Sequence, residues 1–389
     1  MRSWYPLILT LFVGAYLQGC GTSSQWQRGN VTGLPIQRAK SRVAVIPSER
    51  PFPSPNAIRT EVVSATGTID DSVVAPMRLM TTPETAVRVR PVVQPRPAAG
   101  SSTKAKWVPL DYWATSQGFG TLRRISTNQF HLVTHWGVFG LAAKARYAIF
   151  NGWQFYLGYP LRMTNGVPLV NVLDAEKNFL PLAGSYQPIP KTRGIICLDA
   201  GHGGKHNGTK STLGGFFEKN YALDWALRIH PLLRAKGWQV VMTRTNDVTM
   251  SIDQRVAVAD RYGADLFVSL HFNAAGKGAS GLETYCTTPQ GMPSTLTRGY
   301  SDPMSGIMPN NAYDLRNVHL AGRIHNAMIK NVGMADRGVR RARFMSVIAK
   351  QKRPAVLVEG GYLSDPAEAR LIGTAAYRQK LAEAIAKAF

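Results

Sequence analysis

The C-terminal half of the chain alternates short apolar runs with segments of helical periodicity. Continuous apolar runs, which are typical of strands buried on both faces, lie at 194–199, 264–270, 281–286 and 355–360. A further strand is expected at 238–244. Apolar residues recur at helical spacing over 220–236, 251–262, 318–332 and 366–387. This alternation predicts an α/β domain over 192–389, with a mostly parallel twisted sheet flanked by helices.

The region before this domain has a different pattern. Residues 105–190 are rich in aromatic side chains and alternate between apolar and polar, with turn signals at Asn151-Gly152 and Asn165-Gly166. We therefore expect a small α+β domain built from hairpins, preceded by a short helix after Trp107. Residues 21–104 show neither periodicity and are rich in proline, serine, arginine and valine, which predicts a disordered tether.

The N-terminus has the pattern of an export signal. Arg2 precedes an apolar stretch that is too short to span a bilayer, and the stretch ends in Leu17-Gln18-Gly19-Cys20. This ending resembles a bacterial lipobox, which implies that residues 1–20 form a lipoprotein-type signal peptide and that Cys20 is the site of lipid attachment. The alternative is an ordinary secretory signal cut nearby. Gly21 after the cysteine implies an exported protein at the periplasmic face of the outer membrane.

Composition narrows the choice of partners. The 389 residues carry a formal net charge of +23, which favours anionic partners such as an acidic wall polymer or a membrane surface, or serves solubility alone. No motif typical of nucleic-acid binding is present in the sequence, so we expect no nucleic-acid partner. Apart from Cys20, only Cys197 and Cys286 remain, and both lie in apolar runs that favour free buried thiols over a disulfide.

Four side chains that can bind a metal or move a proton lie at the ends of predicted elements. His202, His271 and Glu359 follow or end apolar strands, and Glu218 begins a predicted helix. Ligands of open α/β sheets gather at the carboxyl ends of the strands, so these side chains are expected at one edge. Two histidines and one carboxylate satisfy a catalytic zinc ion, and the fourth residue would then activate water. The alternatives are structural histidines and a phosphate-binding GHGG loop, although that loop lacks the spaced glycines of a P-loop.

A family resemblance decides between these alternatives. The phrases LDAGHGG, GGFFEKNYAL, VVMTRTND, SIDQRVAVAD, DLFVSLHFNA, GLETY, ADRGVRRARFMSV and PAVLVEGGYLSDPAEARLI occur in this order. In combination they resemble the zinc-dependent N-acetylmuramoyl-L-alanine amidases of the amidase 3 type. The resemblance implies that His202, Glu218 and His271 bind Zn²⁺ and that Glu359 is the catalytic glutamate. The implied reaction is hydrolysis of the amide between N-acetylmuramic acid and L-alanine in peptidoglycan.

Other positions receive secondary roles. Asn273 is expected to bind substrate or to orient His271, and Asp199 to support the ligands from behind. For Arg244 and Arg255 we favour a structural ion pair over catalysis. The segment 287–315 is rich in proline, glycine and serine, whereas division-type family members carry an apolar helix that plugs the zinc in a comparable place. We therefore expect a loop on the substrate side.

Some interpretations stay open at this point. The phrases WVPL and NGVPLVNV make residues 105–190 similar to the small N-terminal domain of copper amine oxidases, which implies a stalk or wall-binding role. His131 and His135 lack a partner cluster, so no copper site is expected there. Besides a monomeric amidase, the sequence allows a non-catalytic peptidoglycan-binding lipoprotein or a zinc peptidase that cuts within the stem peptide.

Overall fold

The computed structural model describes residues 106–183 and 194–389. All described residues belong to one compact unit. The predicted signal peptide, Cys20 and the whole of the predicted tether at 21–104 lie outside the described residues. Within the described parts of the chain, no helix is long and apolar enough to cross a membrane.

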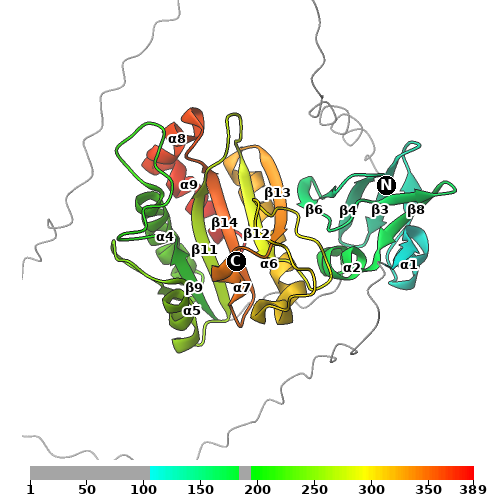
Figure 1. Cartoon of the computed structure of the whole chain (residues 1–389). Helices are drawn as coiled ribbons and strands as arrows, with labels where there is room; N and C mark the ends of the chain where they lie inside the picture. The colour runs from blue at the N-terminus through cyan, green and yellow to red at the C-terminus, as the bar shows by residue number, and fades with distance from the viewer. Residues whose placement is uncertain (1–105, 184–193) are drawn as a thin grey trace, which may run out of the picture. The chain divides into compact units, whose positions relative to one another are not determined.

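A twisted, mostly parallel sheet forms the centre of 194–389, as the sequence predicts (Figure 1). Its strands are β9 (Ile195–Ala200), β10 (Gln239–Met242), β11 (Leu266–Asn273), β12 (Leu282–Thr287), β13 (Asp336–Ala342) and β14 (Ala355–Tyr362). They lie in the order β10-β9-β11-β14-β12-β13. The pairs β10–β9, β9–β11, β11–β14 and β12–β13 are parallel, whereas β12 runs antiparallel to β14. The carboxyl ends of β9, β11 and β14 therefore meet at one edge of the sheet.

Helices cover both faces of this sheet. One face packs against α4 (Glu218–Ala235), α6 (Asp314–Val332) and α9 (Ala375–Ala386), and the other against α5 (Ile252–Arg261) and α7 (Ser346–Ala349). The two faces have separate apolar cores, because side chains alternate along each strand: Ile196 and Leu198 of β9 lie in the first core and Cys197 lies in the second. Both Cys197 and Cys286 are buried free thiols, which confirms that interpretation.

Two details differ from the sequence prediction. The helix expected over 366–387 is two helices, α8 (Pro366–Gly373) and α9, because Thr374 adopts an extended backbone and its side chain accepts a hydrogen bond from the Tyr377 N–H to cap α9. Strand β13 was not predicted. Its sequence, DRGVRRA, has no apolar run, yet most of its residues are buried.

Residues 106–183 form antiparallel hairpins and a short helix. Strand β1 (Trp107–Pro109) leads into α1 (Leu110–Ser116), and the remaining strands are β2 (Leu122–Arg124), β3 (Gln129–Thr134), β4 (Gly137–Ala142), β5 (Tyr147–Phe150), β6 (Trp153–Tyr156), β7 (Arg162–Thr164) and β8 (Val167–Asn171). The β5–β6 and β7–β8 turns lie at Asn151-Gly152 and Asn165-Gly166, as predicted. All four turn residues have positive φ angles, which is the conformation that two-residue hairpin loops require.

The chain then continues through α2 (Val172–Asp174), the π-helix η1 (Ala175–Phe179) and α3 (Leu180–Ala183). Strand β6 pairs with β13 through Phe155 and Val339, which extends the central sheet to eleven strands. Asn178 accepts hydrogen bonds from Arg341 at 2.9 and 3.1 Å, and the apolar core runs through both parts. Strands β2 to β6 therefore share one sheet with residues 194–389, whereas β1, β8 and β7 form a separate three-stranded sheet, and the two parts share one core.

Candidate metal centre

His202 is placed by a tight turn at the end of β9. Its φ angle is 59°, a left-handed conformation that costs a non-glycine residue free energy. The preceding Gly201 packs so closely on His271 that an added Cβ would lie 2.4 Å from its imidazole ring. Only glycine fits there, so the turn brings the two histidine rings together with their centroids 4.9 Å apart.

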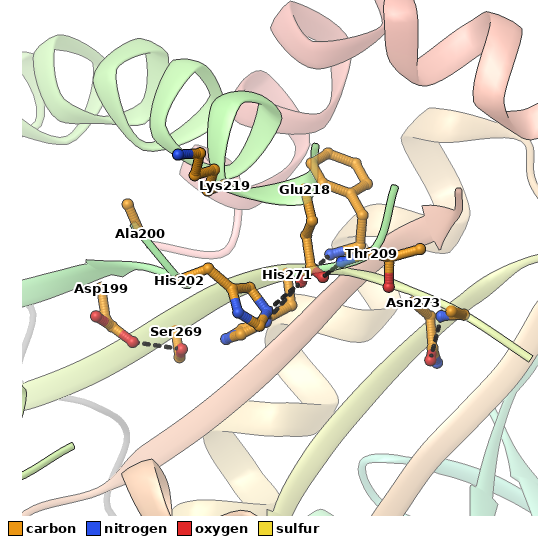
Figure 2. Close-up of polar contacts among 12 residues, drawn as sticks. Asp199, Ala200, His202, Thr209, Glu218, Lys219, Ser269, His271 and Asn273 are labelled. Carbon is orange, nitrogen blue, oxygen red and sulfur yellow. Dashed lines mark hydrogen bonds and ion pairs between the residues drawn. The ribbon is translucent and has the colours of Figure 1, made fainter. Parts of the chain in front are cut away.

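Glu218, the first residue of α4, lies between the two histidines. Its Oε1 atom is 2.7 Å from His271 Nδ1 and 3.1 Å from His202 Nε2 (Figure 2). The other oxygen accepts a hydrogen bond from the Thr209 N–H at 3.0 Å. Burial by itself raises the pKa of this carboxyl, but the hydrogen bonds from His202 and His271 hold it well below the usual range. Glu218 is therefore an ionised carboxylate, whose oxygen atoms could bind a metal ion.

These three side chains fit a zinc ion. One donor atom from each of His202, Glu218 and His271 lies within 4.8 Å of the others, and the described residues contain no second such cluster. Two tetrahedral ligands that are each ~2.0–2.1 Å from one zinc ion lie roughly 3.3 Å apart, close to the distances found here. Imidazole nitrogens with one carboxylate are a donor set that suits zinc, and three protein ligands leave a position for water.

Glu359 lies beside this cluster on the neighbouring strand. In the parallel pair β11–β14, His271 is directly opposite Glu359. The Glu359 side chain is buried, and its Oε2 atom has no hydrogen-bond partner among the described residues. Burial, followed by the charges of Glu218 and Glu283, raises the pKa of Glu359 well above its ordinary value. A divalent cation next to it would offset part of this rise, so Glu359 is suited to take up and release a proton.

Asn273, the last residue of β11, is occupied by protein contacts. Its Nδ2 donates to Glu283 Oε2 at 2.8 Å, and its Oδ1 accepts from the Arg298 guanidinium at 2.6 Å and from the Ala274 N–H at 2.8 Å. The side chain is 3% exposed. A contact between Asn273 and substrate stays a prediction. The structure shows it holding Arg298, a residue that the sequence analysis did not single out because it lies in an irregular segment.

Asp199 does not contact the histidine rings. It pairs with Arg255 at 2.5 Å and accepts hydrogen bonds from Thr243 at 2.7 Å and Ser269 at 2.6 Å, to one side of the histidine cluster (Figure 2). Although burial raises the pKa of Asp199, the Arg255 charge lowers it further, to below the ordinary value. Arg255 also donates to the carbonyl oxygen of His202. This confirms a structural ion pair for Arg255, which links Asp199 to the backbone of His202.

Arg244 supports the same turn and forms no ion pair with any carboxylate in the described ranges 106–183 and 194–389. Its guanidinium donates to the carbonyl oxygens of Ala200, Gly201 and Lys219, each at 2.8 Å. The prediction of an ion pair was therefore wrong for Arg244, because backbone carbonyls take the place of a carboxylate. Burial, together with the charge of Arg255, lowers the pKa of Arg244 to about 10. The buried guanidinium fixes the backbone on both sides of the metal cluster.

Comparison with known proteins relates this geometry to a family. Residues 196–389 match the family model described as N-acetylmuramoyl-L-alanine amidase. The chain is 32% identical over 207 residues to the uncharacterised protein YqiI of Bacillus subtilis, which covers 53% of this chain and 86% of that protein. It is 30% identical over 229 residues to the N-acetylmuramoyl-L-alanine amidase AmiA of Escherichia coli, covering 52% of this chain and 78% of AmiA.

Two further matches differ in how much of the relative they cover. The N-acetylmuramoyl-L-alanine amidase LytC of B. subtilis is 34% identical over 192 residues, which is 49% of this chain but 34% of LytC. Among solved structures, the catalytic domain of the amidase CwlV from Bacillus (Paenibacillus) polymyxa is 28% identical with a TM-score of 0.42, and the match covers 50% of this chain and 95% of that one.

Proposed function

The chain belongs to the N-acetylmuramoyl-L-alanine amidase family, and from this premise we propose that it hydrolyses peptidoglycan with a zinc-activated water. The bond cut is the amide between N-acetylmuramic acid and L-alanine of the stem peptide. One observation carries the zinc dependence: His202, Glu218 and His271 converge within 4.8 Å beside the buried Glu359. The supporting roles of Asn273 and Asp199 are proposed with it.

The residues divide the chemistry between them. His202, Glu218 and His271 would hold the ion, and zinc bound there would act as a Lewis acid and lower the pKa of a water ligand toward ~7. Glu359 takes the proton from the attacking water and passes it to the leaving amine of L-alanine. As the C–N bond breaks, the carbonyl carbon gains the water oxygen and leaves as the lactyl carboxylate. The raised pKa of Glu359 favours this temporary protonation.

The site is open to a substrate on the ligand side. The side chains of His202 and His271 are 29% and 17% exposed. Among the described residues, no member of the segment 288–308 hydrogen-bonds to His202, Glu218 or His271. This supports a loop beside the site in preference to a plug. We also propose that the protein is an exported monomer attached to the outer membrane through a lipid on Cys20, on the basis of the lipobox-like sequence.

Zinc binding is tested by removing one ligand. We expect the purified full-length protein to contain about one zinc ion per chain by elemental mass spectrometry and to release peptides from peptidoglycan. His271→Ala should lose both properties. His206→Ala is the matched control, because His206 is exposed on the same loop and outside the cluster. Full zinc content in His271→Ala, or equal losses in both variants, would contradict the assignment.

A further inference from the structure

The segment 288–308, between β12 and the 3₁₀ helix η2 (Pro309–Tyr313), presents an arginine to the site. We propose that Arg298 binds a free carboxylate of the stem peptide next to the scissile amide, so that the enzyme prefers stems in which this carboxylate is not amidated. The inference rests on the proposed function, because it concerns the substrate of the same site. It assigns a role in binding, and Glu359 retains the proton transfer.

The segment is firmly held although it contains no regular structure before η2. Arg343 donates to the carbonyl oxygens of Pro289 and Met292 at 2.7 and 2.6 Å and pairs with Asp302. The backbone of Thr295 donates to the Arg341 carbonyl oxygen at 2.9 Å. These contacts fix both sides of Arg298 to β13 and its following residues.

The small N-terminal part holds the same segment from outside. The Tyr159 hydroxyl donates to the Gly291 carbonyl oxygen at 2.9 Å, and Arg146 donates to the Ser294 carbonyl oxygen at 3.3 Å. A Cβ added to Gly158 would lie 2.3 Å from the Met292 side chain, so the backbone at Gly158 packs closely against the segment 288–308. An arginine on so constrained a segment can offer a preorganised contact, because little further order is lost on binding.

Arg298 is exposed, and contacts with Asn273 and Phe344 fix the orientation of its side chain. It donates to Asn273 Oδ1 at 2.6 Å, and its guanidinium carbon lies 5.7 Å from the centre of the Phe344 ring. Phe344 is in turn stacked on Tyr300, with ring centroids 5.3 Å apart. The φ angle of Arg298 is 48°, a left-handed conformation that a non-glycine residue adopts only when its surroundings impose it. The guanidinium is thereby held beside the end of β11.

The position is close to the reacting atoms. Asn273 follows His271 by two residues, a rise of roughly 7 Å along a strand. Arg298 also interacts with the Tyr285 hydroxyl and with the charge of Glu359. A carboxylate bound at Arg298 would therefore lie within a few bonds of an amide placed between the metal cluster and Glu359.

Arg298 is close to the charges of Glu359 and Glu283, but it forms no ion pair with either of them among the described residues. Glu283 is paired with Arg337 at 2.8 Å and with Arg340 at 3.0 Å, so its charge is already compensated. Among the described residues, no carboxylate forms a salt bridge with Arg298. A guanidinium has five N–H donors and binds carboxylates through two parallel hydrogen bonds, which leaves capacity beyond the contacts with Asn273 and Tyr285.

The chemistry of the substrate identifies the group that is bound. The sugars and acetamides of the glycan strand are uncharged, whereas free carboxylates lie on the peptide side of the scissile amide. An exposed guanidinium discriminates strongly between a carboxylate and its carboxamide, because only the former carries charge and accepts at both oxygens. Arg298 is therefore assigned to the peptide side of the bond.

The test compares two substrates with the full-length enzyme. Both contain N-acetylmuramoyl-L-alanyl-D-glutamate with the γ-carboxyl blocked as a methylamide; the α-carboxyl is free in one compound and converted to a carboxamide in the other. We expect wild-type kcat/KM to be roughly 10- to 100-fold higher for the free carboxylate, as for one charged hydrogen-bonded pair. Arg298→Gln should lose this preference, mainly through the carboxylate substrate, and Arg298→Lys should retain part of it.

The matched control is Arg261→Gln. Arg261 is the last residue of α5 and is exposed. It lies just before the amino end of β11, whereas the site lies at the carboxyl end, so the variant removes the same charge far from the site. It should leave the preference unchanged. Equal losses on both substrates in Arg298→Gln, or an unchanged preference, would overturn the inference. Failure of wild-type enzyme on both substrates would instead contradict the proposed function.

A binding measurement further separates a failure of the Arg298 inference from a failure of the proposed function. In Glu359→Gln, which should not turn over, calorimetry is expected to show tighter binding of the free carboxylate compound than of its carboxamide. The double variant Glu359→Gln with Arg298→Gln should bind both compounds equally. A preference that survives in the double variant would overturn the assignment of Arg298 even if the enzyme proves active.

Discussion

Two groups of buried carboxylates lie at the carboxyl edge of the central sheet, and they differ in how their oxygens are paired. Asp199 is enclosed by Arg255, Thr243 and Ser269, so that both of its oxygens have strong donors. Glu359, which is also buried, has an oxygen without a partner. Glu218 is intermediate between Asp199 and Glu359: its oxygens have partners, but two of these partners are histidines that could themselves bind a metal ion.

This difference separates structural acids from reactive ones. A buried carboxylate with a complete set of donors stays ionised and contributes to stability, whereas one that lacks donors has a raised pKa and exchanges protons. The pKa of Asp199 is accordingly lowered and that of Glu359 is raised. The turn that carries His202 depends on the first group, and the chemistry of the site depends on the second.

The largest expected effect is on the reactive side of this comparison. Glu359→Gln should lower kcat by roughly 10²- to 10⁴-fold, because the proton carrier is lost while the metal ligands remain. Its zinc content and thermal midpoint should stay at the wild-type values. Kinetics and elemental analysis check this, with the exposed Glu383→Gln as the control. Wild-type activity in Glu359→Gln would show that another group moves the proton.

Asp199→Ala tests the structural side. The substitution leaves the buried Arg255 without its counter-charge, which typically costs about 3–5 kcal/mol of unfolding free energy. Urea unfolding followed by circular dichroism measures the loss. Activity should fall as a consequence, since Arg255 also holds the His202 carbonyl. A variant with wild-type stability and no activity would place Asp199 in the reactive group instead.

Removal of residues 1–190 tests how far the stability of the sheet that carries His202, and of the segment 288–308, depends on the small N-terminal part. We expect residues 191–389 to unfold at lower urea concentration than the full chain, by about 2 kcal/mol or more, because Arg341 loses Asn178 and part of the shared core is exposed. Equal stability of the two proteins would show that residues 191–389 fold independently of the part that precedes them.

The smallest expected effect concerns Asp174, a buried carboxyl in the part of the chain before the central sheet. Burial raises its pKa to about 6, although the N–H groups of Gly158 and Tyr159 and the side chain of Asn178 oppose this rise. Since the folded-state pKa is above the ordinary value of 3.8, folding takes up a proton between these values. This contribution to stability is complete below the ordinary pKa and is lost as the pH rises through about 6.

The wild-type protein should therefore gain about 1 kcal/mol of unfolding free energy from this group when the pH falls from 7 to 5. Asp174→Asn should lack this part of the pH dependence. Urea unfolding at several pH values gives the difference between the two proteins, which cancels the contributions of other groups. Identical pH profiles would contradict the raised pKa.

The sequence predicts the parts of this fold that carry a local signal. Apolar runs indicate β9, β11 and β14, and the residues at their carboxyl ends are the ones that meet in the structure. The pattern alone left structural histidines as an alternative, and the specific roles of His202, Glu218 and His271 came from the family resemblance. Their convergence supports the resemblance, because distant positions arrive at one point.

Other parts depend on contacts that leave no local signal. Strand β13 contains three arginines, and it is buried because Glu283, Asn178 and Tyr156 accept from them across the structure. Its pairing with β6 joins residues that are far apart in the sequence. Arg298 likewise lies among prolines and glycines, and only the tertiary structure shows its contact with Asn273.

The most direct measurement is mass spectrometry of the products released from purified peptidoglycan by the full-length protein, with and without a chelator and with zinc restored. We expect intact glycan strands and free stem peptides that begin with L-alanine, formed only when zinc is present. Products cut within the stem peptide would make the protein a zinc peptidase. The same peptides formed at an undiminished rate after complete zinc removal would contradict the metal-dependent mechanism.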